Sequence, residues 1–74
     1  MSNRFSDAAA GLEALLPGLE FSRETHVQWR DCDQSWRDKN PSIGDVKFHD
    51  ECVREYDKRI KAIELAVDAL RVAT

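Results

Sequence analysis

The chain has 74 residues, of which 34% are charged and 42% hydrophobic, with three glycines and two prolines. This length allows one small domain, and the composition is typical of a helix-rich protein and excludes a β-sandwich or a disordered tail. The net charge of −3 argues against nonspecific nucleic-acid binding, which requires a positive surface field.

Targeting and membrane segments are not evident in the sequence. No apolar run approaches the ~20 residues of a transmembrane helix, and residues 1–5 lack the long apolar core of a signal peptide. Two cysteines are too few for the disulfide framework of a small secreted domain. We therefore expect a cytoplasmic protein with reduced thiols.

A first helix is predicted over residues 6–39. Ser6 and Asp7 precede three alanines and can accept hydrogen bonds from the free amides of a first helical turn. Positions spaced alternately three and four residues apart then form one helical stripe; they are Phe5, Ala8, Leu12, Leu15, Leu19, Ser22, His26, Trp29, Asp33 and Trp36. Pro17 disfavours a helix interior, so the helix either kinks there or ends at Leu16 and restarts. The unbroken stripe favours the kink.

A turn is predicted at residues 40–45, because Pro41 disfavours helical angles in the residue before it. Ser42 and Asp45 have the spacing of a capping box, and Asp45 is alternatively the N-cap itself. A second helix should then cover residues 45–72. Its stripe keeps the alternating spacing throughout; the positions are Val46, His49, Val53, Tyr56, Ile60, Ile63, Val67 and Leu70.

Two helices joined by a short turn predict an all-α antiparallel hairpin, with residues 1–74 as a single helical domain. When the chain folds about residue 41, the two stripes face each other as in a coiled coil. The predicted layers are Trp36 with Val46, Asp33 with His49, Trp29 with Val53, His26 with Tyr56, Ser22 with Ile60, Leu19 with Ile63, Leu15 with Val67, and Leu12 with Leu70. Polar residues then meet near the turn, and apolar residues meet near the termini.

Apolar residues outside the two stripes predict a further packing partner. They are Leu16, Phe21, Ala62, Leu65, Ala66, Ala69 and Val72. A wide apolar arc indicates a helix that is buried on several sides. We expect a homodimer that forms a four-helix bundle with these residues in its interface, since two-fold pairing is the commonest symmetry. The alternative is a monomeric three-helix bundle, in which a short N-terminal helix folds back over the hairpin.

Four possible metal ligands, His26, Cys32, His49 and Cys52, lack the spacing of a zinc site. His26 and Cys32 would lie on the order of 9 Å apart along a helix axis. We therefore expect no metal and no other cofactor. His49 opposite Asp33 suggests a polar pair that fixes the helix register, because no nucleophile or deep pocket is predicted beside it. No catalytic residue is expected, and the protein is predicted not to be an enzyme.

The triplet Trp-Arg-Asp occurs twice, beginning at Trp29 and at Trp36. The stripe positions predict that both tryptophans fill the core near the turn, whereas Phe48 lies off the stripe and should be exposed. Tryptophan and arginine often anchor protein interfaces. We therefore predict a partner-binding surface near the turn, formed by Arg30, Trp36, Arg37 and Phe48.

The predicted function is that of a non-catalytic protein–protein interaction module. It would be a small adaptor, inhibitor or regulator of a partner protein, of the kind that phages, mobile elements and compact bacterial genomes encode. One alternative is a nucleic-acid-associated transcriptional regulator, whose basic cluster would be Arg54, Lys58, Arg59 and Lys61. Another is a metal- or redox-responsive module that uses Cys32, Cys52 and His49. Membrane binding is not expected.

Overall fold

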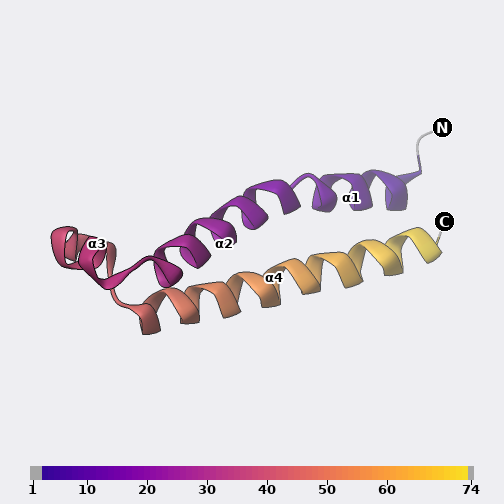
Figure 1. The fold of residues 1–74 in the computed structure, drawn as a ribbon. Helices are drawn as coiled ribbons and strands as arrows, with labels where there is room; N and C mark the ends of the chain where they lie inside the picture. The colour runs from indigo at the N-terminus through magenta and orange to yellow at the C-terminus, as the bar shows by residue number, and fades with distance from the viewer. Residues whose placement is uncertain (1–2, 74) are drawn as a thin grey trace.

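Two long helical arms run antiparallel in the computed structural model, which describes residues 3–73 (Figure 1). The elements in chain order are α1 (Arg4–Glu13), α2 (Leu16–Asp31), α3 (Gln34–Lys39), the 3-10 helix η1 (Pro41–Ile43) and α4 (Val46–Val72). The first arm consists of α1 and α2, and the second arm is α4. The chain is therefore all-α and forms a helical hairpin, closed at one end by α3 and η1.

The hairpin is a narrow rod. Its extents are 57 × 17 × 14 Å and its radius of gyration is 16.9 Å, whereas a compact domain of this length has a radius of about 11 Å. α1 continues the line of α2 along α4 (Figure 1), so the alternative of a folded-back N-terminal helix is wrong. Within residues 3–73, no helix combines the length and apolar character that a bilayer-spanning segment requires.

Short polar side chains determine where the two arms begin. Asn3 caps α1, because its Oδ1 accepts a hydrogen bond from the backbone N–H of Phe5 at 2.8 Å, and α1 starts before the predicted residue 6. Asp45 caps α4 by accepting a hydrogen bond from the backbone N–H of Phe48 at 2.7 Å. Asp45 as the N-cap of the second helix is thus confirmed, and this helix ends at Val72 as predicted.

The first arm is interrupted near its proline. Ala14 and Leu15 lie between α1 and α2, and Pro17 occupies the first turn of α2. Proline is tolerated at this position, because the amide groups of a first turn have no partner within the helix. An interruption near residue 17 is confirmed, but the favoured kink in one continuous helix is wrong, because α1 ends at Glu13 and a new helix starts at Leu16.

A second interruption separates α2 from α3, and the stripe pattern does not predict it. Cys32 has an extended backbone, and Asp33 caps α3 by accepting a hydrogen bond from the backbone N–H of Trp36 at 2.9 Å. The continuous helix predicted to residue 39 is therefore wrong. The physical reason is that the short Asp33 side chain offers the backbone a local hydrogen bond that competes with the helix.

The stripe of the first arm that faces α4 keeps the predicted Leu12 and Leu19 but differs from the prediction at two positions. Ala8 and Leu15, both predicted to face α4, are exposed. The buried and half-buried apolar positions keep the spacing of three and four; they are Ala9, Leu12, Leu16 and Leu19. The predicted layer of Leu15 with Val67 is wrong, and Leu16 lies beside Val67 in its place.

Contacts between the arms confirm the predicted register. The rings of His26 and Tyr56 stack with their centroids 5.8 Å apart, as folding about residue 41 requires. Three ion pairs join the arms at compatible positions; they are Glu13–Arg71, Arg23–Asp57 and Arg30–Asp50. The Asp33–His49 layer is wrong, because Asp33 lies at the exposed start of α3 and His26 takes the place beside His49.

Candidate functional site

The closed end of the hairpin, residues 29–50, is the candidate functional site, and we call it the tip. His49 lies at its centre and is fully buried. The ring of His49 contacts the rings of Trp29 and Phe48 edge to face, with centroid distances of 5.4 and 5.0 Å. The tip is therefore organised around a buried imidazole with aromatic neighbours.

His26 of α2 and His49 of α4 share a hydrogen bond between their Nδ1 atoms, which are 2.8 Å apart. The other nitrogen of His49, Nε2, is hydrogen-bonded to the backbone carbonyl of Ile43. Because a carbonyl only accepts, Nε2 of His49 carries a proton, and Nδ1 of the neutral ring is the acceptor. His26 therefore donates from Nδ1, so the geometry fixes the tautomer of both rings.

Protonation of His26 is unfavourable. Partial burial lowers the pKa of His26, and the neighbouring His49 lowers it further. Through its hydrogen bonds, the histidine pair joins α2, α4 and η1.

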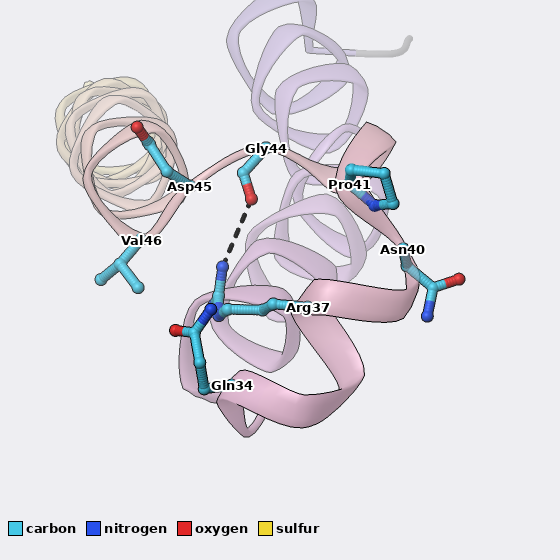
Figure 2. Close-up of a pocket in the computed structure, with 7 residues that line it drawn as sticks. All are labelled: Gln34, Arg37, Asn40, Pro41, Gly44, Asp45 and Val46. Carbon is cyan, nitrogen blue, oxygen red and sulfur yellow. Dashed lines mark hydrogen bonds between the residues drawn. The ribbon is translucent and has the colours of Figure 1, made fainter.

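Arg37 is a second polar centre of the tip and is only 9% exposed. Its Nη2 donates to the carbonyls of Trp29 and Arg30 at the end of α2, and its Nη1 donates to the carbonyl of Gly44 at 3.3 Å (Figure 2). The last carbonyls of a helix have no partner within the helix, and a cation there is favourable. Arg37 therefore holds α2, α3 and the turn together.

Gly44 has a backbone conformation that few other residues adopt. Its φ is +89°, and a Cβ atom at this position would lie 3.0 Å from Cδ1 of Phe48 and 3.4 Å from Nε2 of His49. A side chain would thus meet both backbone strain and crowding. Glycine here lets the turn pack closely on the start of α4.

The predicted partner-binding residues have different environments. Phe48 is 51% exposed, as predicted, and Trp36 is 43% exposed. Arg30 is half-buried and pairs with Asp31 and Asp50. The guanidinium of Arg37 already donates hydrogen bonds to backbone carbonyls. Of the four predicted residues, Trp36 and Phe48 are therefore the most accessible to a partner.

The prediction that both tryptophans fill the core is wrong. Trp29 and Trp36 are both exposed, and so is Val46, the predicted partner of Trp36. The cause is the break before α3, which turns Trp36 away from the line of α2. The sequence pattern alone treats the two tryptophans as members of one helix.

Two open grooves flank the tip. One, of about 410 Å³, is lined by Gln28, Trp29, Cys32, Asp33 and Trp36. The other, of about 340 Å³, is lined by His26, Phe48, Glu51, Cys52, Glu55, Tyr56 and Arg59. A third hollow, drawn in Figure 2, lies between Gln34, Arg37 and the turn. Open surfaces of this kind suit contact with another macromolecule better than enclosure of a small substrate.

The two cysteines are free thiols on different elements. The sulfur of Cys32 donates to the carbonyl of Trp29 at 3.1 Å, and Cys52 lines the groove beside His26. Within residues 3–73, no three His, Cys, Asp or Glu side chains are grouped in a way that could hold a metal ion. No observation in this region favours the metal- or redox-responsive alternative.

The basic cluster considered for nucleic-acid binding is partly neutralised. Arg54 pairs with Asp50 and Lys58 pairs with Glu55. The guanidinium of Arg59 lies 5.5 Å from the centre of the Tyr56 ring. Charges that are already paired contribute less to the positive field that a phosphate backbone requires.

The predicted dimer-interface residues lie away from the tip. Leu16 and Ala66 are half-buried within the hairpin. The others are exposed, with exposed fractions of 75% for Phe21, 60% for Leu65 and 86% for Val72, and Ala62 and Ala69 are exposed as well.

Sequence reasoning missed two features of the tip, the His26–His49 pair and the buried role of Arg37. His26 lies much farther along the chain from the turn than His49 does, so folding about residue 41 gives no signal for this pair. For Arg37, the signal is the Asp33 cap four residues earlier, which starts a new helix and turns Arg37 back toward the end of α2.

Comparison of the chain with protein-family models, with curated proteins and with solved structures gave no match.

Replacing Arg37 with methionine should lower the free energy of unfolding by roughly 1.5–3 kcal/mol, the usual range for hydrogen bonds to a charged group. The variant keeps an unbranched side chain but leaves the carbonyls of Trp29, Arg30 and Gly44 without their donor. Urea unfolding followed by circular dichroism would measure the change. Lys39→Met, at an exposed position of the same helix, is the matched control and should stay near the wild type; an equally stable Arg37→Met protein would contradict the assigned role.

Acidification from pH 7.5 to pH 5 should lower the melting temperature. The fold lowers the pKa of His26, so the unfolded chain binds a proton more readily than the native chain does. This contribution to stability is complete above the ordinary histidine pKa, near 6.5, and is lost as the pH falls through the lowered value. Circular dichroism melts at several pH values would test this. His26→Gln should flatten the dependence, and a wild-type melting temperature that rises on acidification would contradict the prediction.

Proposed function

We propose that this chain is a non-catalytic protein–protein interaction module, a small adaptor, inhibitor or regulator that acts as a homodimer. The observation that carries the proposal is the apolar surface that the hairpin leaves uncovered. Among residues 3–73, the buried apolar side chains are Ala9, Val53 and Val67. A cytoplasmic location belongs to the same proposal, since two free thiols suit a reducing compartment.

The exposed area supports a second copy as one partner. The accessible surface of the chain is 5472 Å², whereas a globular protein of 8.5 kDa exposes about 4,700 Å². The excess of about 800 Å² is close to the area that each partner contributes to an interface of standard size. Two hairpins packed together would form a four-helix bundle, the common architecture for amphipathic helix pairs.

The tip is the surface that we assign to a different partner protein. Trp36 and Phe48 are exposed there beside the half-buried Arg30, and residues of these types often dominate binding energy. The buried His49 and Arg37 hold this surface in place from below. The open grooves that flank the tip favour binding over catalysis.

Sedimentation velocity at tens of micromolar should give a mass near twice the 8.5 kDa of one chain. The melting temperature should also rise with protein concentration, because association stabilises the folded state by mass action. A chain that stays monomeric at 100 micromolar, with a melting temperature independent of concentration, would rule out the homodimer.

Trp36→Ala and Phe48→Ala should weaken capture of a partner protein from a lysate of the source cells, because each removes an exposed aromatic anchor. Lys61→Ala, at an exposed position far from the tip, is the control and should capture the same protein as the wild type. Quantitative mass spectrometry of the captured proteins is the measurement. If both aromatic variants retain the same partners at the same level, the tip is not the binding surface.

A further inference from the structure

We propose that the second copy packs on one particular side of the hairpin, which we call the alanine side. On the first arm it presents Ala8, Gly11 and Leu15, and on α4 it presents Ala62, Ala66 and Ala69. The inference rests on the homodimer proposed above and names the surface that forms it.

The two sides of the hairpin follow from the geometry of α4. The face of α4 that meets the first arm is a stripe of buried and half-buried residues, which are Val53, Tyr56, Ile60, Ile63, Val67 and Leu70. Because each residue turns an α-helix by about 100°, Ala66, Ala62 and Ala69 lie roughly 90–150° from that face in one direction. Glu64, Asp57 and Asp68 lie roughly 70–110° from it in the opposite direction. The side with the alanines is thus largely apolar, whereas the acidic direction is charged and also contains Lys61 and Arg71.

Inter-arm ion pairs and a groove agree with this division. Arg23–Asp57, Arg30–Asp50 and Glu13–Arg71 all involve α4 residues from the acidic direction. The groove on that side has four carboxylates among its lining residues; they are Glu13, Glu20, Glu64 and Asp68. Two copies that met through this side would set like charges against each other, which is unfavourable.

Among the described residues, the alanine side carries one charged residue along the half of the hairpin near the termini, the exposed Arg4 at the start of α1. The same rotation of about 100° per residue places Ala8, Gly11 and Leu15 there on the first arm. Ala8 and Gly11 are exposed, and the space around Gly11 is open, since a Cβ atom there would meet nothing within 4 Å. Small side chains on both arms allow two hairpins to approach closely.

Leu15 is the large apolar residue on this side, and it is 55% exposed. It lies beside the buried stripe of Ala9, Leu12, Leu16 and Leu19 rather than in it, so the hairpin covers it only in part. In a two-fold contact, the Leu15 side chain of each copy has room against the small residues of the other. Burial of this residue together with the alanines accounts for part of the excess exposed area.

Phe21 and Leu16 fall outside this surface. Phe21 lies about 180° around α2 from the face that meets α4, and Leu16 lies in the stripe that packs within the hairpin. The proposed contact therefore differs from the interface expected from the sequence alone, and Phe21 supplies a matched control.

Charge placed on the alanine side tests the inference. Ala62→Glu and Ala69→Glu alter exposed helix positions with a residue that favours helix, so each variant should keep the circular dichroism spectrum of the wild type. We expect both to sediment as monomers. The dissociation constant of each variant dimer should be at least tenfold higher than that of the wild type. Phe21→Glu, on the other side of α2, should remain a dimer.

A mixture of variants adds a readout that misfolding cannot produce. Ala69→Glu and Ala69→Lys should each be monomeric alone, and an equimolar mixture should recover the dimer mass, because a two-fold contact brings the opposite charges together. A wild-type monomer would overturn the homodimer and this inference together. A dimeric wild type that stays dimeric with Ala62→Glu and Ala69→Glu, but dissociates with Phe21→Glu, would overturn the alanine side and leave the proposed homodimer intact.

Discussion

A pair of antiparallel helices encloses no interior, and each helix can bury one stripe of side chains against the other. In this hairpin the stripe is narrow, with Ala9, Val53 and Val67 as its buried apolar residues in the described part of the chain. The rod shape, the exposed leucines and alanines, and the excess surface all follow from this limit. A chain of this size usually reaches stability through an additional partner or staple, which is the physical reason for the homodimer that we propose.

Polar contacts replace an apolar core at the tip. The one large side chain that is fully buried in the described residues is His49. Arg37 is also buried, and it bonds to Gly44, which lies against His49. Both bind backbone carbonyls at the ends of helices or in the turn, and every buried side-chain nitrogen or oxygen within residues 3–73 has a partner. Satisfied polar networks define one geometry more strictly than apolar packing does. The tip can therefore present Trp36 and Phe48 in a fixed arrangement.

The sequence predicted the elements that depend on strong local signals. The Asp45 cap and the end of the second helix at Val72 agree with the structure, and so does the register that stacks His26 on Tyr56. The hairpin itself follows from the spacing of apolar residues and from the proline turn.

The errors have a common cause, which is that a stripe pattern does not reveal a change of phase. Ala8 and Ala9, like Leu15 and Leu16, are neighbouring apolar residues, so either member of each pair fits a stripe through Leu12 and Leu19 equally well. The pattern also passed through Asp33 without a gap, although the Asp33 carboxylate caps a new helix. Because this cap starts a new helix, Trp36 does not continue the stripe of α2, and the Arg37 side chain bonds to the end of α2. With Asp33 absent from the layer beside His49, His26 pairs with His49 instead.

The separation of contacting residues along the chain increases steadily from the tip to the termini. Arg37 and Gly44 are 7 residues apart, His26 and His49 are 23 apart, and Glu13 and Arg71 are 58 apart. Since closing a longer loop costs more chain entropy, the hairpin should fold like a zipper that starts at the tip and closes toward the ends. The open end, where the start of α1 lies beside the end of α4 (Figure 1), is then the last part to form. Because the alanine side occupies that same half, the homodimer that we propose would couple final closure of each hairpin to recognition of its copy.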